Sequence, residues 1–479
     1  MRRSAPLCAA MVMALFATML VAGAQGASAG QYTRTAGPDF DCDGVRDAVQ
    51  ADSLDVVSGR DGAGSVTVTY GASGRRHQIT QATSGVPGSP EVDDAFGDSY
   101  AWYDRDRNGC DDLVIGVPGE SIGTKRAAGM VIYIPGSASG LNTAKSAGYT
   151  QNSPGYPGKV EAGDAFGDSL AAGTTRQGVP FLLIGAPGED GPSIWTASSG
   201  TVYYVRGSTV KLLHQDTPGV AGKREHDEYF GESLSASDRF FAVGIPGESI
   251  GSVRGAGMVQ VFSHTLTNGR PTPIGGFHQN TKGISGVAER DDWFGASVSV
   301  VSFRSSSSQP IGALVGVGTM AEGVGSADAA GMAHLVYITP SGTVRQRAAV
   351  TQRTPGVTGT PEEGDYLGSD VVVANLSASS TVARPSTAAW AVGVNQELHP
   401  GGLGGVHVFR PGWKPGDPDI WLREGRLGIG PMSNIDHLRA TRTELFWGSH
   451  GGSCDSARWS DLLDGGPFEP TYRPYDDCQ

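Results

Sequence analysis

The stretch Phe96-Gly97-Asp98-Ser99 recurs along this chain of 479 residues. Its further copies are Phe-Gly-Asp-Ser at 166–169, Phe-Gly-Glu-Ser at 230–233 and Phe-Gly-Ala-Ser at 294–297, with a degenerate copy, Leu-Gly-Ser, at 367–369. Successive copies begin 64 to 73 residues apart, and a period of this length is typical of a propeller or another repeat array. Each copy must then be one supersecondary unit that needs its neighbours to bury a core.

The same order of features follows the quoted stretch in each copy. Two apolar runs are separated by a glycine-rich loop, as in Leu113–Pro118 followed by Gly129–Ile134. Short apolar runs bounded by turn residues are typical of buried strands. Equivalent pairs of runs stand at 181–187 and 200–205, 241–246 and 257–262, 314–318 and 331–338, and 390–394 and 405–409. Each repeat is therefore predicted to be a small sheet without a helix.

Two further copies lie at the ends of the repeat array. Asp47 to Val66 spans as many positions as Asp112 to Val131, which indicates a first, degraded copy. Leu-Gly at 427–428, followed by an aromatic run at 445–448, indicates a divergent seventh copy. Terminal repeats are often atypical, and radial closure of four-stranded blades hides the edges of repeated sheets. Gly 72 and Pro 28 also favour short strands and tight turns over long helices.

The sequence thus predicts an all-β fold, a single seven-bladed β-propeller over residues 31–479. Its closing blade could combine the C-terminal segment with an N-terminal strand. The repeats are expected at about 31–95, 96–165, 166–229, 230–293, 294–366, 367–426 and a divergent 427–479.

These motifs carry a resemblance to a known family. Phe-Gly, then D-x-D-x-D-G-x-x-D, then an apolar Gly-Ala-Pro segment such as Ile184–Pro187 resembles the FG-GAP repeat of the integrin alpha-subunit propeller. The similarity extends over most of the chain from about residue 31. It implies a seven-bladed propeller that holds calcium in inter-strand loops and meets its partners on the opposite face.

Two segments carry the calcium pattern. The expected ligands are Asp39, Asp41, Asp43, Val45 and Asp47 in the first, and Asp104, Asp106, Asn108, Cys110 and Asp112 in the second. Hard cations take six to eight oxygens, and alternating acids direct their carboxyl or amide groups inward. By analogy with the family, Val45 and Cys110 contribute backbone carbonyls.

The spacing of these acids excludes an EF-hand, because the twelfth position holds Gln50 or Ile115 in place of glutamate. The competing interpretation is a surface Asx turn without metal. Later repeats depart from the pattern at 173–178, 235–238 and 305–308, so we expect two Ca²⁺ ions.

The chain begins with the features of a secretory signal. Arg2 and Arg3 precede an apolar run over 9–21, and residues 27–29 offer an A-x-A cleavage site, so residues 1–29 are predicted to be removed. The run is too short for a spanning helix. We expect a secreted, extracellular monomer without membrane insertion. The net charge of −13 speaks against nucleic acid or an anionic membrane as a partner.

Four cysteines remain after removal of the signal, and an even number in a secreted protein favours two disulfides. Three connectivities are possible. We favour Cys42–Cys110 together with Cys454–Cys478. The absence of a C-x-x-C pair in the sequence argues against zinc and redox chemistry.

Several motifs imitate those of hydrolases. Gly167–Leu170 reads as a GDSL signature, and Gly119–Gly123 and Gly247–Gly251 match the G-x-S-x-G nucleophile elbow. An elbow needs a strand, a turn and then a helix, whereas a strand is expected next in both copies. The serine also recurs in other repeats, although a nucleophile is needed only once. We therefore predict structural roles and no catalytic residue.

Acidic pairs precede each Phe-Gly stretch and would form a ring if the blades close. They are Glu91 with Asp93, Glu161 with Asp164, Glu225 with Asp227, Glu289 with Asp291, and Glu362 with Asp365. Paired carboxylates can perform glycosidase chemistry, but repeated pairs are more often turn caps or solvated surface.

The sequence favours a secreted, non-catalytic recognition module for an extracellular protein or glycan. The alternatives are a secreted hydrolase or lyase with its site on a propeller face, and a purely structural surface protein. The aromatic C-terminal stretch 413–478, with Trp421, Trp447 and Trp459, is where a specific site could lie, since exposed aromatics anchor sugars and proteins. Burial in a blade core is nevertheless the favoured expectation for each of these tryptophans.

Overall fold

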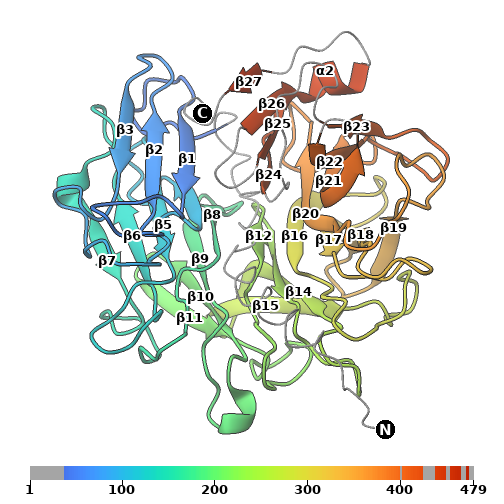
Figure 1. Cartoon of the computed structure of the whole chain (residues 1–479), viewed down its shortest axis with the longest axis horizontal. Coiled ribbons are helices and arrows are strands. Elements are labelled where there is room, and N and C mark those ends of the chain that lie inside the picture. The colour runs from blue at the N-terminus through green and yellow to red at the C-terminus, as the bar shows by residue number, and fades with distance from the viewer. Residues whose placement is uncertain (1–36, 400–401, 424–436, 449–453, 465–470, 474–479) are drawn as a thin grey trace, which may run out of the picture.

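The computed structural model describes residues 37–399, 402–423, 437–448, 454–464 and 471–473. The predicted signal segment 1–29 and Cys478 lie outside these ranges. Seven antiparallel sheets follow one another along the chain and are arranged in a ring, from the blue first sheet to the red seventh (Figure 1). The prediction of an all-β, seven-bladed propeller is confirmed.

Every sheet is made of consecutive strands. The first three sheets contain β1 (Ala48–Asp52), β2 (Ser65–Thr69) and β3 (Arg76–Ile79); β4 (Tyr100–Tyr103), β5 (Asp112–Val117), β6 (Met130–Ile134) and β7 (Ala147–Tyr149); and β8 (Leu170–Thr174), β9 (Pro180–Ala186), β10 (Thr201–Arg206) and β11 (Thr209–Leu213). The fourth and fifth contain β12 (Leu234–Ala236), β13 (Phe240–Ile245), β14 (Met258–Thr267) and β15 (Arg270–Phe277); and β16 (Ser297–Phe303), β17 (Gly312–Thr319), β18 (Met332–Ile338) and β19 (Val344–Val350).

The last two sheets contain β20 (Leu367–Asn375), β21 (Ala388–His399), β22 (Gly402–Phe409) and β23 (Ile420–Leu422); and β24 (His437–Ala440), β25 (Glu444–Gly448), β26 (Cys454–Arg458) and β27 (Thr471–Arg473). Short helical turns add η1 (Thr143–Lys145), η2 (Ile194–Thr196) and α2 (Trp459–Asp464). The apolar runs chosen from the sequence form the second and third strands of their sheets.

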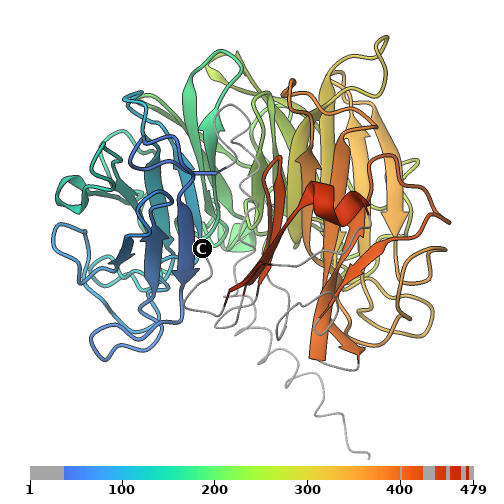
Figure 2. The same cartoon turned by 90° about the horizontal axis from the view of Figure 1, so that it is seen from above.

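The first and seventh sheets meet where the ring closes. The described part of the first sheet begins with β1, the equivalent of β5, so it has three strands. The strands described in the seventh sheet all come from the C-terminal segment, and none of them is the N-terminal strand that the sequence suggested for the closing blade. Arg46, just before β1, forms an ion pair with Glu444 and lies over the ring of Phe446. Figure 2 shows the ring from a second direction.

The Phe-Gly stretch of each blade makes a close backbone contact with the preceding blade. Gly200 pairs with Phe230 through an isolated parallel bridge, and a Cβ on Gly200 would lie 2.3 Å from the Phe230 nitrogen. The φ of Gly200 is +77°, a conformation that L-residues with side chains rarely adopt. The same close approach joins Gly257 to Phe294. The repeat therefore needs glycine at the start of each third strand.

The aromatic residues of the C-terminal stretch are part of the core. Trp413, Trp421, Trp447 and Trp459 are all buried, as the sequence favoured, so they are not exposed anchors for a ligand. By contrast, Trp195 in η2 has 77% of its surface exposed. Across the described residues, no helix combines the length and the apolar character required to span a membrane.

Candidate metal centre

Two equivalent loops at one end of the propeller carry the predicted calcium pattern. The first precedes β1, and the second connects β4 to β5. In each loop the last aspartate, Asp47 or Asp112, is fully buried. Its Oδ2 accepts a hydrogen bond from the backbone N–H seven residues earlier, and its Oδ1 accepts one from the backbone N–H 24 residues later. The shared spacing seen in the sequence therefore reflects a shared hydrogen-bond pattern.

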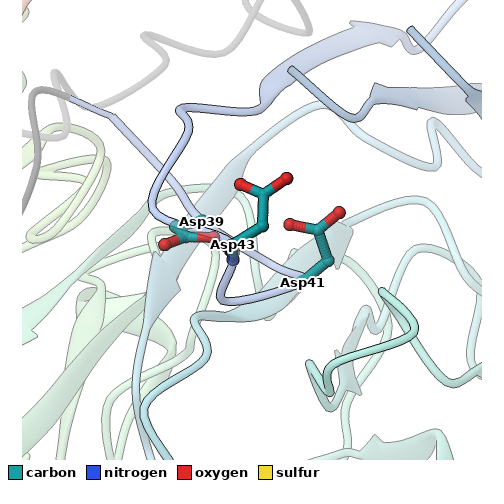
Figure 3. Close-up of side chains that lie close together, drawn as sticks. All are labelled: Asp39, Asp41 and Asp43. Carbon is teal, nitrogen blue, oxygen red and sulfur yellow. Dashed lines mark hydrogen bonds between the residues drawn. The ribbon is translucent and has the colours of Figure 1, made fainter. Parts of the chain in front are cut away.

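The first loop gathers the three alternating acids. Each of Asp39, Asp41 and Asp43 places a carboxylate oxygen within 4.8 Å of the others, and Figure 3 shows the three side chains on the same turn. Asp39 also caps the loop, because its carboxylate accepts the backbone N–H groups of Asp43 and Gly44 at 3.1 Å. Asp41 Oδ1 is buried without a hydrogen-bond donor. Burial, Asp43 and Asp39 raise the pKa of Asp41, although a backbone hydrogen bond and Arg75 oppose the shift, as expected for acids gathered in one turn.

The second loop forms a similar group. Asp104, Asp106 and Asp112 bring carboxylate oxygens within 4.8 Å of one another. Asn108 lies against them, and its amide nitrogen donates to Asp106 Oδ2 at 3.3 Å and to the Gly136 carbonyl at 3.1 Å. The side chains of this loop offer carboxylate and amide oxygens, the ligands that Ca²⁺ prefers. The residues of both loops therefore fit this ion.

The other predicted ligands make hydrogen bonds within the loops. Asp47 is not in the first group of acids, and both of its carboxylate oxygens accept backbone hydrogen bonds. Burial raises the pKa values of Asp47 and Asp112 to about 6. The N–H groups of Val45 and Cys110 donate to the side chains two residues earlier, at 2.7 Å in both loops. These contacts shape the turns.

A disulfide between Cys42 and Cys110 ties the two loops together, which confirms one of the two predicted pairs. The second pair includes Cys478, which lies outside the described residues. The sequence reasoning missed Asp111, whose Oδ2 accepts the backbone N–H of Asp39 at 3.1 Å and whose own N–H donates to the Asp39 carbonyl. Only the spatial contact between neighbouring repeats shows that Asp111 supports the first loop.

The serine of the GDSL match and its equivalents in other repeats have structural partners. Ser169, in the GDSL match, is fully buried, and its Oγ donates to the Gly231 carbonyl of the next blade at 2.5 Å. Ser99 and Ser233 make the equivalent bonds to Gly167 and Gly295. The two G-x-S-x-G segments lead into β6 and β14 rather than into helices.

We expect Ser169→Ala to lower the free energy of unfolding by about 1–2 kcal/mol, because a buried carbonyl loses its donor. Urea unfolding of this variant beside the wild type measures the change. Ser249→Ala is the matched control, since Ser249 is only half-buried, and it should change stability by less than about 0.5 kcal/mol. Loss of an esterase activity in Ser169→Ala would contradict the structural role.

The acids before Phe-Gly cap turns, which is one of the roles that the sequence favoured. In three copies, however, the capping residue is the neighbour of the acid named from the sequence. Asp94, Glu228 and Asp292 accept the backbone N–H three residues earlier, whereas the neighbouring Asp93, Asp227 and Asp291 were named from the sequence. Asp164 and Asp365 cap as expected. The capping residues all stand two positions before the Phe or Leu of the repeat, which an alignment on that residue would have found.

Comparison with known proteins adds no argument about fold or function. No family model matches the chain, and no curated protein matches it. Among solved structures, the crystal structure of Saccharomyces cerevisiae Sqt1 aligns over 74% of this chain and 81% of that chain, at 11% sequence identity and a TM-score of 0.36. This similarity is too distant to support an inference about partners.

Proposed function

We propose that the protein is a secreted, calcium-binding β-propeller of the FG-GAP type that acts as a non-catalytic recognition module for a protein or glycan ligand. One observation carries the proposal: Ser169, which imitates the nucleophile of a GDSL motif, makes a contact between blades, whereas two loops keep grouped acids. Fold alone does not assign a function.

In this proposal Asp39, Asp41 and Asp43 hold one Ca²⁺, and Asp104, Asp106 and Asp112 hold another. The ion would neutralise acids that otherwise repel one another. The disulfide between Cys42 and Cys110 couples the two sites, so each ion also stabilises the neighbouring blade. A disulfide of this kind is compatible with an oxidising, extracellular compartment.

The face opposite these loops is the proposed recognition surface. Successive connections in an antiparallel sheet lie at alternate ends of it, so the connection between β9 and β10 is opposite the calcium loops. This connection carries Trp195, the largest exposed apolar side chain described. Exposed tryptophans are frequent anchors of protein and glycan ligands. Trp195 therefore marks the place where binding is to be tested.

We expect calcium to raise the melting temperature relative to chelator. Binding only to the native state contributes about 2.7 kcal/mol at a hundredfold excess over Kd. The double variant Asp41→Ala, Asp106→Ala should bind two fewer ions in equilibrium dialysis, and the exposed Glu363→Gln should bind as many as the wild type. Equal ion numbers in the double variant and the wild type would show that the loops do not bind calcium.

Recognition is tested on a glycan array and by capture of extracellular proteins, with and without calcium. A ligand captured by the wild type should be lost in Trp195→Ala, while the melting temperature of that variant stays unchanged. Calcium-dependent turnover of an ester or polysaccharide that is lost in Ser169→Ala would instead favour the hydrolase or lyase.

A further inference from the structure

The residue before the Phe-Gly stretch differs between repeats, at the end of the propeller opposite the calcium loops. It is Ala95 and Ala165 in the second and third blades, but Tyr229, Trp293 and Tyr366 in the next three. All five residues have a positive φ, between +53° and +57°, which is uncommon for bulky side chains. A small residue therefore satisfies the backbone of the repeat, and the three aromatic rings are additions to it.

The backbone at this position makes one contact with the preceding blade. The N–H of Tyr229 donates to the Ser198 carbonyl at 3.1 Å, and the other four residues make the equivalent bond at 2.9–3.0 Å. Because the bond joins backbone atoms, it does not need a ring. Ala95 is 5% exposed, whereas the three aromatic residues are only half-buried. Part of each ring therefore reaches solvent.

The connection that carries Trp195 lies against the first of these aromatic residues. In the first, second, fourth and fifth blades an isolated bridge closes the equivalent connection, as between Ile122 and Lys125. The third blade has η2 there instead. Just after η2, the Ala197 carbonyl accepts the N–H of Asp227 at 3.0 Å, two residues before Tyr229. Trp195, which is 77% exposed, thus stands beside the start of the fourth blade.

We call Trp195, Tyr229, Trp293 and Tyr366 the aromatic track. Its members come from the third, fourth, fifth and sixth blades in turn, so the track follows the ring of blades. The contact residues that dominate a protein interface usually cluster at its centre. Aromatic rings spread over four successive blades suit an extended ligand better.

Charged side chains of both signs accompany the track. The Tyr229 hydroxyl donates to Asp227 Oδ1 at 3.4 Å, so the ring and this exposed carboxylate are neighbours. The exposed groups near Tyr229 are Lys223, Glu225, His226 and Asp227, and those near Trp293 are Arg254, Glu289, Arg290 and Asp291. Beside Tyr366 stand the exposed Glu362 and Glu363. This mixture attracts neither a polyanion nor a polycation strongly, and it therefore favours a neutral ligand.

We propose that the aromatic track binds a neutral, linear polysaccharide of β-1,4-linked pyranose units. This inference rests on the proposed function and names the class of its ligand. An aromatic ring packs against the apolar C–H face of a sugar ring. The carboxylates and basic groups beside it accept from and donate to the sugar hydroxyls. Successive rings of the track contact successive parts of the extended chain.

Native gel electrophoresis of the full mature chain tests this proposal. The gels contain hydroxyethyl cellulose, glucomannan or hydroxyethyl chitin, which are neutral, or carboxymethyl cellulose, which adds negative charge to the cellulose chain. We expect at least one neutral polymer to retard the protein and carboxymethyl cellulose to leave its mobility unchanged. No retardation by any of the three neutral polymers, or equal retardation by carboxymethyl cellulose, would overturn the proposal.

Variants of the track then test the rings. Trp293→Ala should bind the retarding polymer about tenfold more weakly, and Trp293→Phe, which keeps a ring, should bind more tightly than Trp293→Ala. The matched control is Val92→Ala, which removes a 55% exposed apolar side chain before the Ala95 copy and should bind as the wild type does. If the melting temperature of Trp293→Ala falls, Tyr229→Ala repeats the test in another blade. Binding equal to that of the wild type in the alanine variants of the track would refute the assignment.

This proposal and the proposed function fail separately. If no polysaccharide retards the chain, but a captured extracellular protein is lost in Trp195→Ala, the recognition module stands and the polysaccharide assignment is wrong. If a retarding polysaccharide is also depolymerised, and Trp293→Ala loses the retardation, the assignment stands and the non-catalytic function is wrong.

Discussion

Replacing Phe166 by alanine is expected to lower the free energy of unfolding by about 3–5 kcal/mol. Phe166 is fully buried between the second and third blades. Its ring meets the edge of Tyr203 at 5.0 Å and that of Tyr156 at 5.9 Å between centroids. Removal of the ring leaves a cavity in a junction where the backbone of Phe166 is already in close contact with Gly129. Urea unfolding followed by fluorescence measures the loss.

The repeat supplies its own control for this prediction. The sixth copy has Leu367 in place of phenylalanine and is equally buried, so Phe166→Leu should cost about 1–1.5 kcal/mol. The exposed Trp195 can be replaced by alanine with a change of less than about 0.5 kcal/mol. If Phe166→Ala were as mild as Trp195→Ala, the Phe-Gly stretch would not be part of the core.

Two buried histidines are expected to contribute less to the stability of the fold in acid than at neutral pH. His264 bonds through Nδ1 to the Tyr204 hydroxyl and through Nε2 to the Ser237 carbonyl, and burial lowers its pKa to about 3, with Arg206 acting in the same direction. Burial lowers the pKa of His334 to about 4, although its bond to Gln346 opposes the shift. Both side chains are nearly inaccessible to solvent.

The direction of the pH effect follows from the histidine pKa values of the unfolded and folded states. The unfolded chain takes up protons on histidine near pH 6.5, whereas the folded chain does not until pH 4 or 3. The stabilising contribution is therefore complete above pH 6.5 and falls as the pH drops toward these values. At pH 4.5 the loss is about 2.5 kcal/mol for each histidine. Carboxyl groups whose pKa is raised by burial, such as Asp47 and Asp112, act in the opposite direction. The histidine contribution is therefore measured as the difference in unfolding free energy between wild type and a histidine variant from pH 7 to pH 4.5.

A variant isolates the contribution of His264 from that of the buried acids. His264→Gln removes the titration, so the stability of the wild type relative to this variant should fall by about 2.5 kcal/mol between pH 7 and pH 4.5, even if the variant is less stable at pH 7. His226, which is exposed and paired with Asp227, is the control, and His226→Gln should keep the pH dependence of the wild type. The same pH slope in His264→Gln and wild type would refute the assignment.

The sequence by itself determined the number and order of the blades. The Phe-Gly copies, the paired apolar runs and the shared spacing from Asp47 and Asp112 are local patterns, and local patterns fix strands, turns and their repetition. The same comparison showed that the two acidic loops occupy equivalent positions. The disulfide Cys42–Cys110, favoured among the possible cysteine pairings, is present in the structure. The comparison of repeats also explained the repeated serines, because a residue that recurs from repeat to repeat is expected to have a structural role in the repeat.

Only the tertiary structure decided which side chains form contacts between neighbouring blades. At five junctions a glutamine of the linker donates to a glutamate 33 to 45 residues later, and no local periodicity relates the two. It also decided burial: the C-terminal tryptophans lie in the core and Trp195 lies outside. Aromatic residues suit both environments, so burial depends on the neighbours that the closed ring brings, and those neighbours come from distant parts of the chain.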